Sequence, residues 1–86
     1  MGDLFFQFTF LIFDTMTQQE FTTQLQTRPV YLKYDFEDCV LRSEPGQGWW
    51  VKFAGEPEFK AKPGSKLVAD AQSPPVEISK SEYDSY

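Results

Sequence analysis

Few side chains in this 86-residue chain are able to do nucleophilic or acid–base chemistry. Histidine is absent, and Cys39 is the single cysteine, so no intramolecular disulfide can form. Histidine is the commonest general base and metal ligand. A cysteine reacts as its thiolate, which the neighbouring carboxylates Glu37 and Asp38 disfavour. The sequence therefore predicts no catalytic residue, no metal site and no cofactor.

Carboxylate pairs also catalyse reactions, and Asp35, Glu37 and Asp38 are candidates for such a pair. Catalysis by two carboxylates needs surroundings that separate their pKa values. Nothing in this stretch does so, and acidic residues at the start of a strand commonly solvate a turn. We therefore expect a protein that is not an enzyme.

The charge balance bears on the class of partner. Eight basic and thirteen acidic residues give a net charge of -5, which repels the phosphate backbone of nucleic acids. We therefore expect no nucleic-acid partner. The same charge suits an ordinary soluble domain or an acidic protein that imitates nucleic acid.

The N-terminal region is dominated by an almost wholly apolar run, Leu4 to Phe13. The run is too short to span a bilayer and has no basic segment before it, so we expect no membrane insertion, no targeting signal and a cytoplasmic protein. A β-strand and a sticky interfacial segment are two readings of this run. The third is an apolar extension, residues 1–15, upstream of a folded unit that begins near Met16.

The rest of the chain carries helix and strand signals in a clear order. Thr17 to Glu20 form a capping box that predicts a helix over 18–26. Apolar alternation and turn residues predict strands over 29–34, 36–43, 49–54 and 58–62, followed by a helix over 66–72. A stiff Ser-Pro-Pro segment precedes a second capping box at Ser79, which predicts a terminal helical turn.

This order predicts one small α+β domain. Its antiparallel meander has three to four strands, with an N-terminal helix and short C-terminal helices, and a small open β-barrel is the alternative. We place the domain at residues 16–73 and a linker with a short helical tail at 74–86. With 41% hydrophobic residues, the chain has enough apolar surface for one core.

Alternation within the strands separates a core face from a second face. Trp49, Val51 and Phe53 share one side of their strand, so Trp50 and Lys52 must share the other. The same rule puts Tyr31 and Lys33 opposite the core side of the first strand. These four residues, Tyr31, Lys33, Trp50 and Lys52, are the candidate interaction surface, because an exposed tryptophan is a favoured binding anchor. The alternative is that a helix or the N-terminal run covers Trp50.

These observations favour a non-enzymatic protein-interaction module or an accessory, regulatory subunit whose partner is another protein. A homodimer formed through the apolar run or the exposed sheet face is a second hypothesis for the partner. An acidic inhibitor that imitates nucleic acid and a small-molecule-binding domain are the alternative functions.

Overall fold

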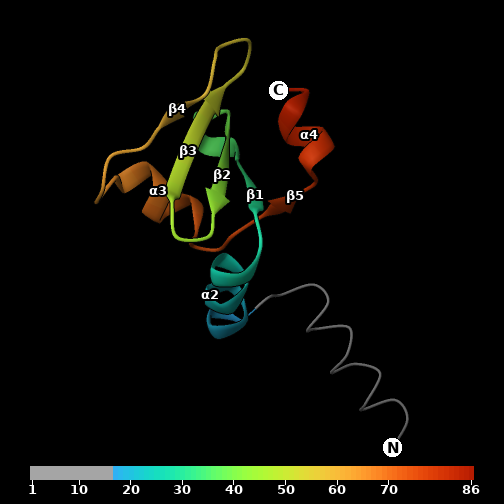
Figure 1. Cartoon of the computed structure of the whole chain (residues 1–86). Coiled ribbons are helices and arrows are strands. Elements are labelled where there is room, and N and C mark those ends of the chain that lie inside the picture. The colour runs from blue at the N-terminus through green and yellow to red at the C-terminus, as the bar shows by residue number, and fades with distance from the viewer. Residues whose placement is uncertain (1–16) are drawn as a thin grey trace, which may run out of the picture.

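The structure is a computed structural model that describes residues 17–86 (Figure 1). The expected extension over residues 1–15, with its apolar run, lies outside the described residues and stays a prediction.

The described chain forms an open, five-stranded antiparallel sheet with helices packed against it, in the strand order β4-β3-β2-β1-β5. The α+β meander is therefore confirmed, and the sheet does not close into a barrel. The strand bounds are β1 Val30–Tyr34, β2 Cys39–Glu44, β3 Gly48–Phe53, β4 Phe59–Lys60 and β5 Glu77–Ile78.

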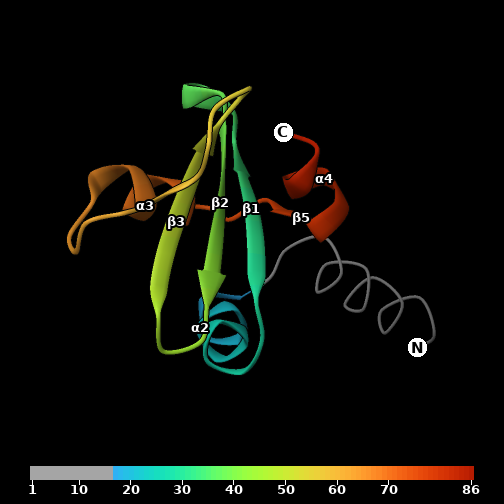
Figure 2. The ribbon, with the colours of Figure 1, turned by 45° about the horizontal axis from the view of Figure 1, so that its top comes forward.

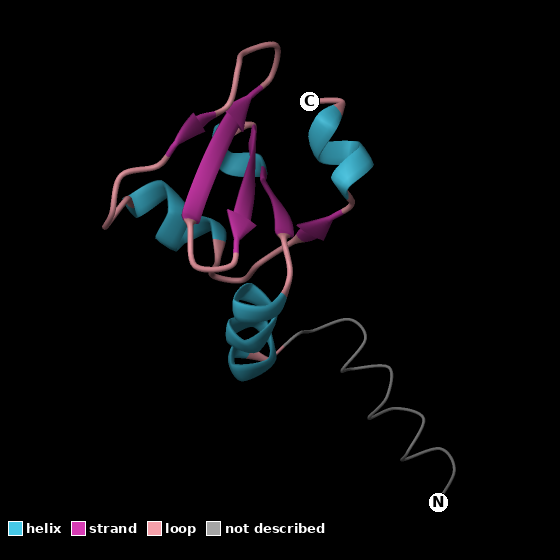
Figure 3. Ribbon diagram, viewed as in Figure 1, coloured by secondary structure: helices cyan, strands magenta, loops and turns pink. Residues whose placement is uncertain are grey.

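Within residues 17–86, three α-helices and one 3-10 turn accompany the sheet (Figure 3). Their bounds are α2 Gln18–Thr27, η1 Asp35–Glu37, α3 Lys66–Ala71 and α4 Lys80–Asp84. Side-chain oxygens of Thr17, Ser65 and Ser79 accept hydrogen bonds from backbone amides of the first turns of α2, α3 and α4. Such caps satisfy amides that have no partner inside the helix, which explains why each helix begins where its capping residue predicts.

The core lies on one face of the sheet. Phe21 of α2 and Val68 and Ala71 of α3 pack there against buried strand residues, which are Val30, Leu32, Cys39, Leu41 and Val51. The core side predicted for the strands that are β1 and β3 is therefore the observed one. Figure 2 shows β1, β2 and β3 side by side, with α4 beside the β1–β5 edge.

The start of the second predicted strand is wrong. Residues 35–37 form η1, and Asp38 has a left-handed backbone with φ 49° before β2 begins at Cys39. Aspartate tolerates this conformation better than most residues, so the acidic stretch makes a turn where alternation alone suggested a strand. Phe36 is consequently exposed at this turn.

The fourth predicted strand is shorter than expected. Only Phe59–Lys60 pair with β3, and the Phe59 side chain is half exposed. A two-residue edge strand presents little unpaired backbone to another molecule.

The C-terminal residues form a fifth strand that the sequence analysis did not predict. Tyr31 and Leu32 of β1 pair with Ile78 and Glu77 of β5, and the Lys33 amide donates to the Val76 carbonyl over 2.9 Å. The helical turn expected after Ser79 is present as α4. The segment after the two prolines therefore packs on the sheet and covers part of its second face.

Candidate protein-interaction surface

The face of the sheet opposite the core is called here the outer face. One row of cross-strand neighbours runs over it from Tyr31 through Arg42 and Trp50 to Lys60, and a second contains Lys33, Val40 and Lys52. Directly opposed residues of antiparallel strands project from the same side. The outer face is therefore aromatic and basic along its length, with carboxylates at its margins.

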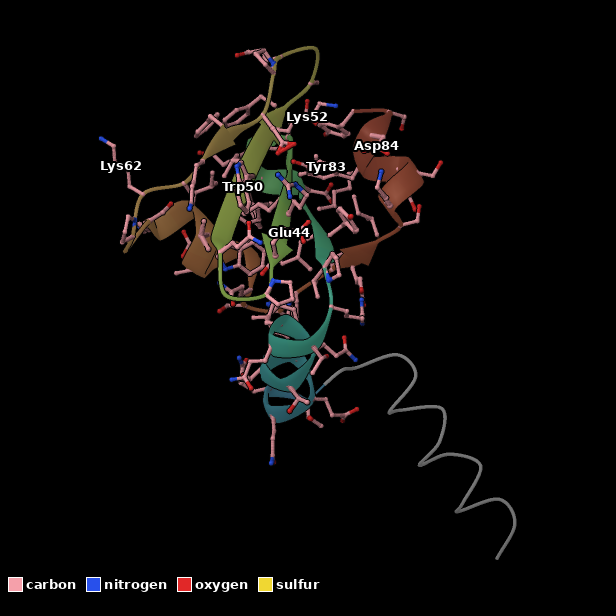
Figure 4. All side chains as sticks on the ribbon, viewed as in Figure 1. Glu44, Trp50, Lys52, Lys62, Tyr83 and Asp84 are labelled. Atoms are coloured by element: carbon pink, nitrogen blue, oxygen red, sulfur yellow. The ribbon has the colours of Figure 1, made fainter. Side chains whose placement is uncertain are left out.

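All four residues predicted as an interaction surface lie on this outer face, but α4 covers part of it. The Tyr83 ring of α4 is buried and lies 5.3 Å from the Tyr31 ring, centroid to centroid. Lys52 places its ammonium 5.8 Å from the Tyr83 ring centroid and donates to the Asp84 carbonyl over 3.3 Å. Figure 4 shows Trp50, Lys52 and Tyr83 on one side of the sheet. Tyr31 and Lys52 therefore hold α4 in place, which leaves Trp50 in the uncovered part.

Trp50 is partly exposed, and two cations flank its ring. The guanidinium carbon of Arg42 lies 4.1 Å from the ring centroid, and the Lys60 ammonium lies 5.1 Å from it. Each such contact is worth about 0.5–1 kcal/mol at an exposed site. The indole is thus held in one orientation, which lowers the conformational entropy lost when a partner binds it.

Two carboxylates hold the Arg42 side chain in place beside Trp50. The guanidinium of Arg42 donates to Glu58 Oε1 over 2.6 Å and to Glu44 Oε2 over 2.8 Å. Burial lowers the pKa of Arg42, but the hydrogen bonds to Glu58 and Glu44 outweigh it and raise that pKa above its ordinary value. Arg42 therefore stays charged and in place beside Trp50.

Lys33 occupies the end of the outer face near η1. Its ammonium lies 3.6 Å from Asp35 Oδ1, and both side chains are exposed. An exposed pair of this kind contributes little to stability. Lys33 therefore lies on the predicted face, but in the row of Val40 and Lys52 and not in the row of Trp50.

Sequence reasoning missed Arg42, Lys60 and Tyr83 as members of this surface. The three-residue loop between Glu44 and Gly48 fixes the hairpin register and sets Arg42 opposite Trp50. The length of this loop, and therefore the position of Arg42 opposite Trp50, can be read from the sequence. The position of Tyr83 cannot be read from it, because Tyr83 follows β5, which pairs with the distant strand β1.

Cys39 is buried in the core face. Burial, followed by the charges of Glu37 and Asp38, raises the pKa of its thiol to about 11. At neutral pH this group is a packed, protonated side chain. Within residues 17–86, no three His, Cys, Asp or Glu residues are grouped so that they could hold a metal ion.

An open groove of about 470 Å³ lies between α3 and the β3–β4 edge. Trp49, Ala61 and Val68 provide apolar lining, and Lys60 and Lys62 lie at its rim. This groove is where the small ligand of the alternative hypothesis would fit. None of the helices described over residues 17–86 has the length and apolarity needed to cross a membrane.

Comparison with known proteins gives one informative similarity. No protein-family model matches the chain, and no curated protein sequence matches it significantly. Among solved structures, the chain is similar to one chain of the crystal structure of the complex between the type VI effector Tas1 and its immunity protein. The TM-score is 0.63 and the identity 35%, over 70% of this chain and 83% of that one. At this identity and coverage, the protein belongs to the same family as that chain of the Tas1 complex.

Proposed function

We propose that this protein is an immunity protein, which binds the toxic domain of a type VI effector and neutralises it. The observation that carries the proposal is the 35% identity to one chain of an effector–immunity complex. A protein that neutralises a toxin by binding needs a contact surface and no chemistry of its own. We therefore also propose that the chain is not an enzyme.

The side-chain inventory supports the immunity role over the effector role. The chain has no histidine, and its one cysteine is buried with a raised pKa. The outer face supplies a tryptophan, arginine and lysine, and the first two are among the commonest binding hot spots. These groups suit recognition of a protein better than nucleophilic or acid–base catalysis.

We propose that the partner contacts the uncovered part of the outer face, with Trp50 as its anchor. Arg42 and Lys60 already orient the indole, and Glu44 and Glu58 already orient Arg42. A surface whose side chains are ordered before binding loses less entropy on association. Trp50→Ala should therefore weaken binding strongly and leave the fold intact.

A growth assay tests the role. The full chain is expressed alone, and together with Tas1 or with each type VI effector of its own source organism. Expression alone should leave growth unchanged, and coexpression should protect the cells from one of these effectors. Growth arrest by the chain alone would assign it to the effector side, and absence of protection from every effector would refute the proposal.

Two variants separate binding from folding in this assay. Trp50→Ala should lose protection while keeping the circular dichroism spectrum of the wild type, with a melting temperature lowered only by the loss of the two cation contacts to the ring. Gln19→Ala, on the exposed surface of α2, is the matched control and should protect fully. Protection by Trp50→Ala equal to that of the wild type would remove the outer face from the proposal.

A further inference from the structure

Phe36 is the most exposed large apolar side chain among the described residues, with 90% of its surface accessible. It belongs to η1, the connection between β1 and β2. Single exposed apolar residues are ordinary on protein surfaces, so the exposure of Phe36 alone does not mark a binding site. The contacts around Phe36 show whether its side chain projects from a loose loop or from an ordered turn.

The backbone that carries Phe36 is held from several sides. The Asp38 amide donates to the Asp35 carbonyl over 3.2 Å, and the Tyr86 hydroxyl donates to the Asp38 carboxylate. The Tyr86 carbonyl in turn accepts from the amide of Gly55 in the β3–β4 loop over 3.1 Å. Three segments far apart in sequence therefore meet beside η1. Phe36 is presented from an ordered turn.

An aromatic neighbour widens the apolar surface at this turn. The Tyr34 ring lies 5.9 Å from the Phe36 ring, centroid to centroid, and Tyr34 is itself only partly buried. The two rings form a small apolar projection, called here the aromatic tip. It lies at the η1 end of the sheet, next to the Lys33 end of the outer face.

The charges around the aromatic tip are mostly negative. Asp35, Glu37 and Asp38 flank Phe36 and are exposed, and Lys33 is the cation that pairs with Asp35. Burial first, and then the negative charges of Asp70 and Glu37, raise the pKa of Tyr34. A partner of this tip must accept an aromatic side chain that is surrounded by carboxylates.

We propose that Phe36 anchors this end of the protein in an apolar pocket rimmed by lysine and arginine on the effector's toxic domain. The inference rests on the proposed immunity function and adds a second contact to it, beside the outer face. Opposite charges at the rim speed association, and a desolvated aromatic ring at the centre slows dissociation.

The same charges argue against other occupants of the tip. A second copy that met the tip with its own tip would bring like charges together, which is unfavourable across an interface. The groove beside α3 of a second copy, which Lys60 and Lys62 help to line, would receive the ring only in a head-to-tail contact, and such a contact does not form a closed symmetric dimer. An anionic membrane surface or a nucleic acid would repel the three carboxylates in the same way. A basic protein surface is the occupant that matches both the ring and its charges.

The test measures binding of the full chain to the effector from which it protects cells, by biolayer interferometry at low and moderate salt. Phe36→Ala should raise the Kd by about thirtyfold or more, as for other hot-spot residues, mainly through faster dissociation. The double variant Asp35→Asn and Glu37→Gln should slow association severalfold and reduce its dependence on salt. Phe59→Ala, which removes a half-exposed ring elsewhere on the molecule, is the control and should bind within about threefold of the wild type.

The outcomes distinguish this inference from the proposed function. If the wild type binds and Phe36→Ala binds within twofold of it, the tip is not an anchor and the immunity role stands. If the wild type binds no effector, both proposals fall. Because Phe36 is almost fully exposed, its alanine variant should melt with the wild type, which keeps loss of binding apart from loss of folding.

Discussion

The guanidinium group of Arg42 lies over the Trp50 ring while it donates hydrogen bonds to Glu58 and Glu44. One arginine thus links two carboxylates to the aromatic centre of the outer face. Because all of these groups are near the surface, their contribution to stability depends on ionic strength.

Replacing Glu58 by glutamine should weaken this network without unfolding the protein. Glu58 accepts from Arg42 and from the Tyr83 hydroxyl, and a partly exposed ion pair is worth about 0.5–1 kcal/mol. We expect the free energy of unfolding to fall by about that amount at low salt. Urea titrations at low and high salt measure it, and an equally large loss in both would exclude an ionic cause.

Removing the Tyr83 ring should cost more than removing its hydroxyl. The ring is buried between α4 and β1, and Tyr83→Ala should destabilise the protein by about 3 kcal/mol, as for other buried aromatic rings. Tyr83→Phe loses a hydrogen bond and should cost about 1 kcal/mol. Urea unfolding followed by tryptophan fluorescence compares the two. Equal losses would show that packing of α4 contributes nothing.

Alkaline pH should destabilise the protein, and Cys39 should account for the first part of the loss. Its pKa rises from an ordinary value near 9.0 to about 11 because of burial and then the charges of Glu37 and Asp38. The unfolded chain therefore releases this proton at lower pH than the folded one. The contribution of Cys39 is fully present below about pH 9 and is lost as the pH rises through about 11.

Urea titrations at pH 7, 9 and 10.5 on the wild type and Cys39→Ala check this. The variant is expected to lose less stability than the wild type between pH 9 and 10.5. A parallel decline of both proteins would contradict the assignment. Burial also predicts that iodoacetamide labels the thiol at pH 8 only in molecules that are transiently open or unfolded, and therefore much more slowly than in the unfolded chain.

Alanine at Gly46 should loosen the hairpin that aligns Arg42 with Trp50. Gly46 has φ 72°, and an added Cβ would meet no atom within 4 Å. The loss of about 1 kcal/mol would therefore come from backbone strain alone. Asparagine tolerates this conformation better, so Gly46→Asn should cost less than Gly46→Ala. Equal thermal stabilities of Gly46→Ala and the wild type would contradict this account of the turn.

Local patterns in the sequence predicted the central part of this fold. Alternation placed Val51 and Trp50 on opposite faces of β3, and capping residues placed the helices. Alternation also placed Tyr31, Lys33, Trp50 and Lys52 on the face opposite the core, and the strand register has all four there. Their part in binding stays a prediction.

The parts that sequence reasoning missed depend on long-range contacts or on one unusual backbone angle. β5 has two residues and pairs with a strand more than forty positions earlier, so alternation gave no signal for it. The left-handed Asp38 moved the start of the expected second strand from residue 36 to Cys39 and left Phe36 exposed in the turn before it. α4 covers Tyr31 because it follows β5, which pairs with β1.

The pairing of β5 with β1 has a consequence for the nascent chain. During synthesis, β1, β2 and β3 leave the ribosome before residues 76–78 do, so the amide of Lys33 and its neighbours lack their final partners for that interval. An open strand edge of this kind pairs readily with another unfinished chain. A chain that is cut short before Val76 should therefore aggregate through β1.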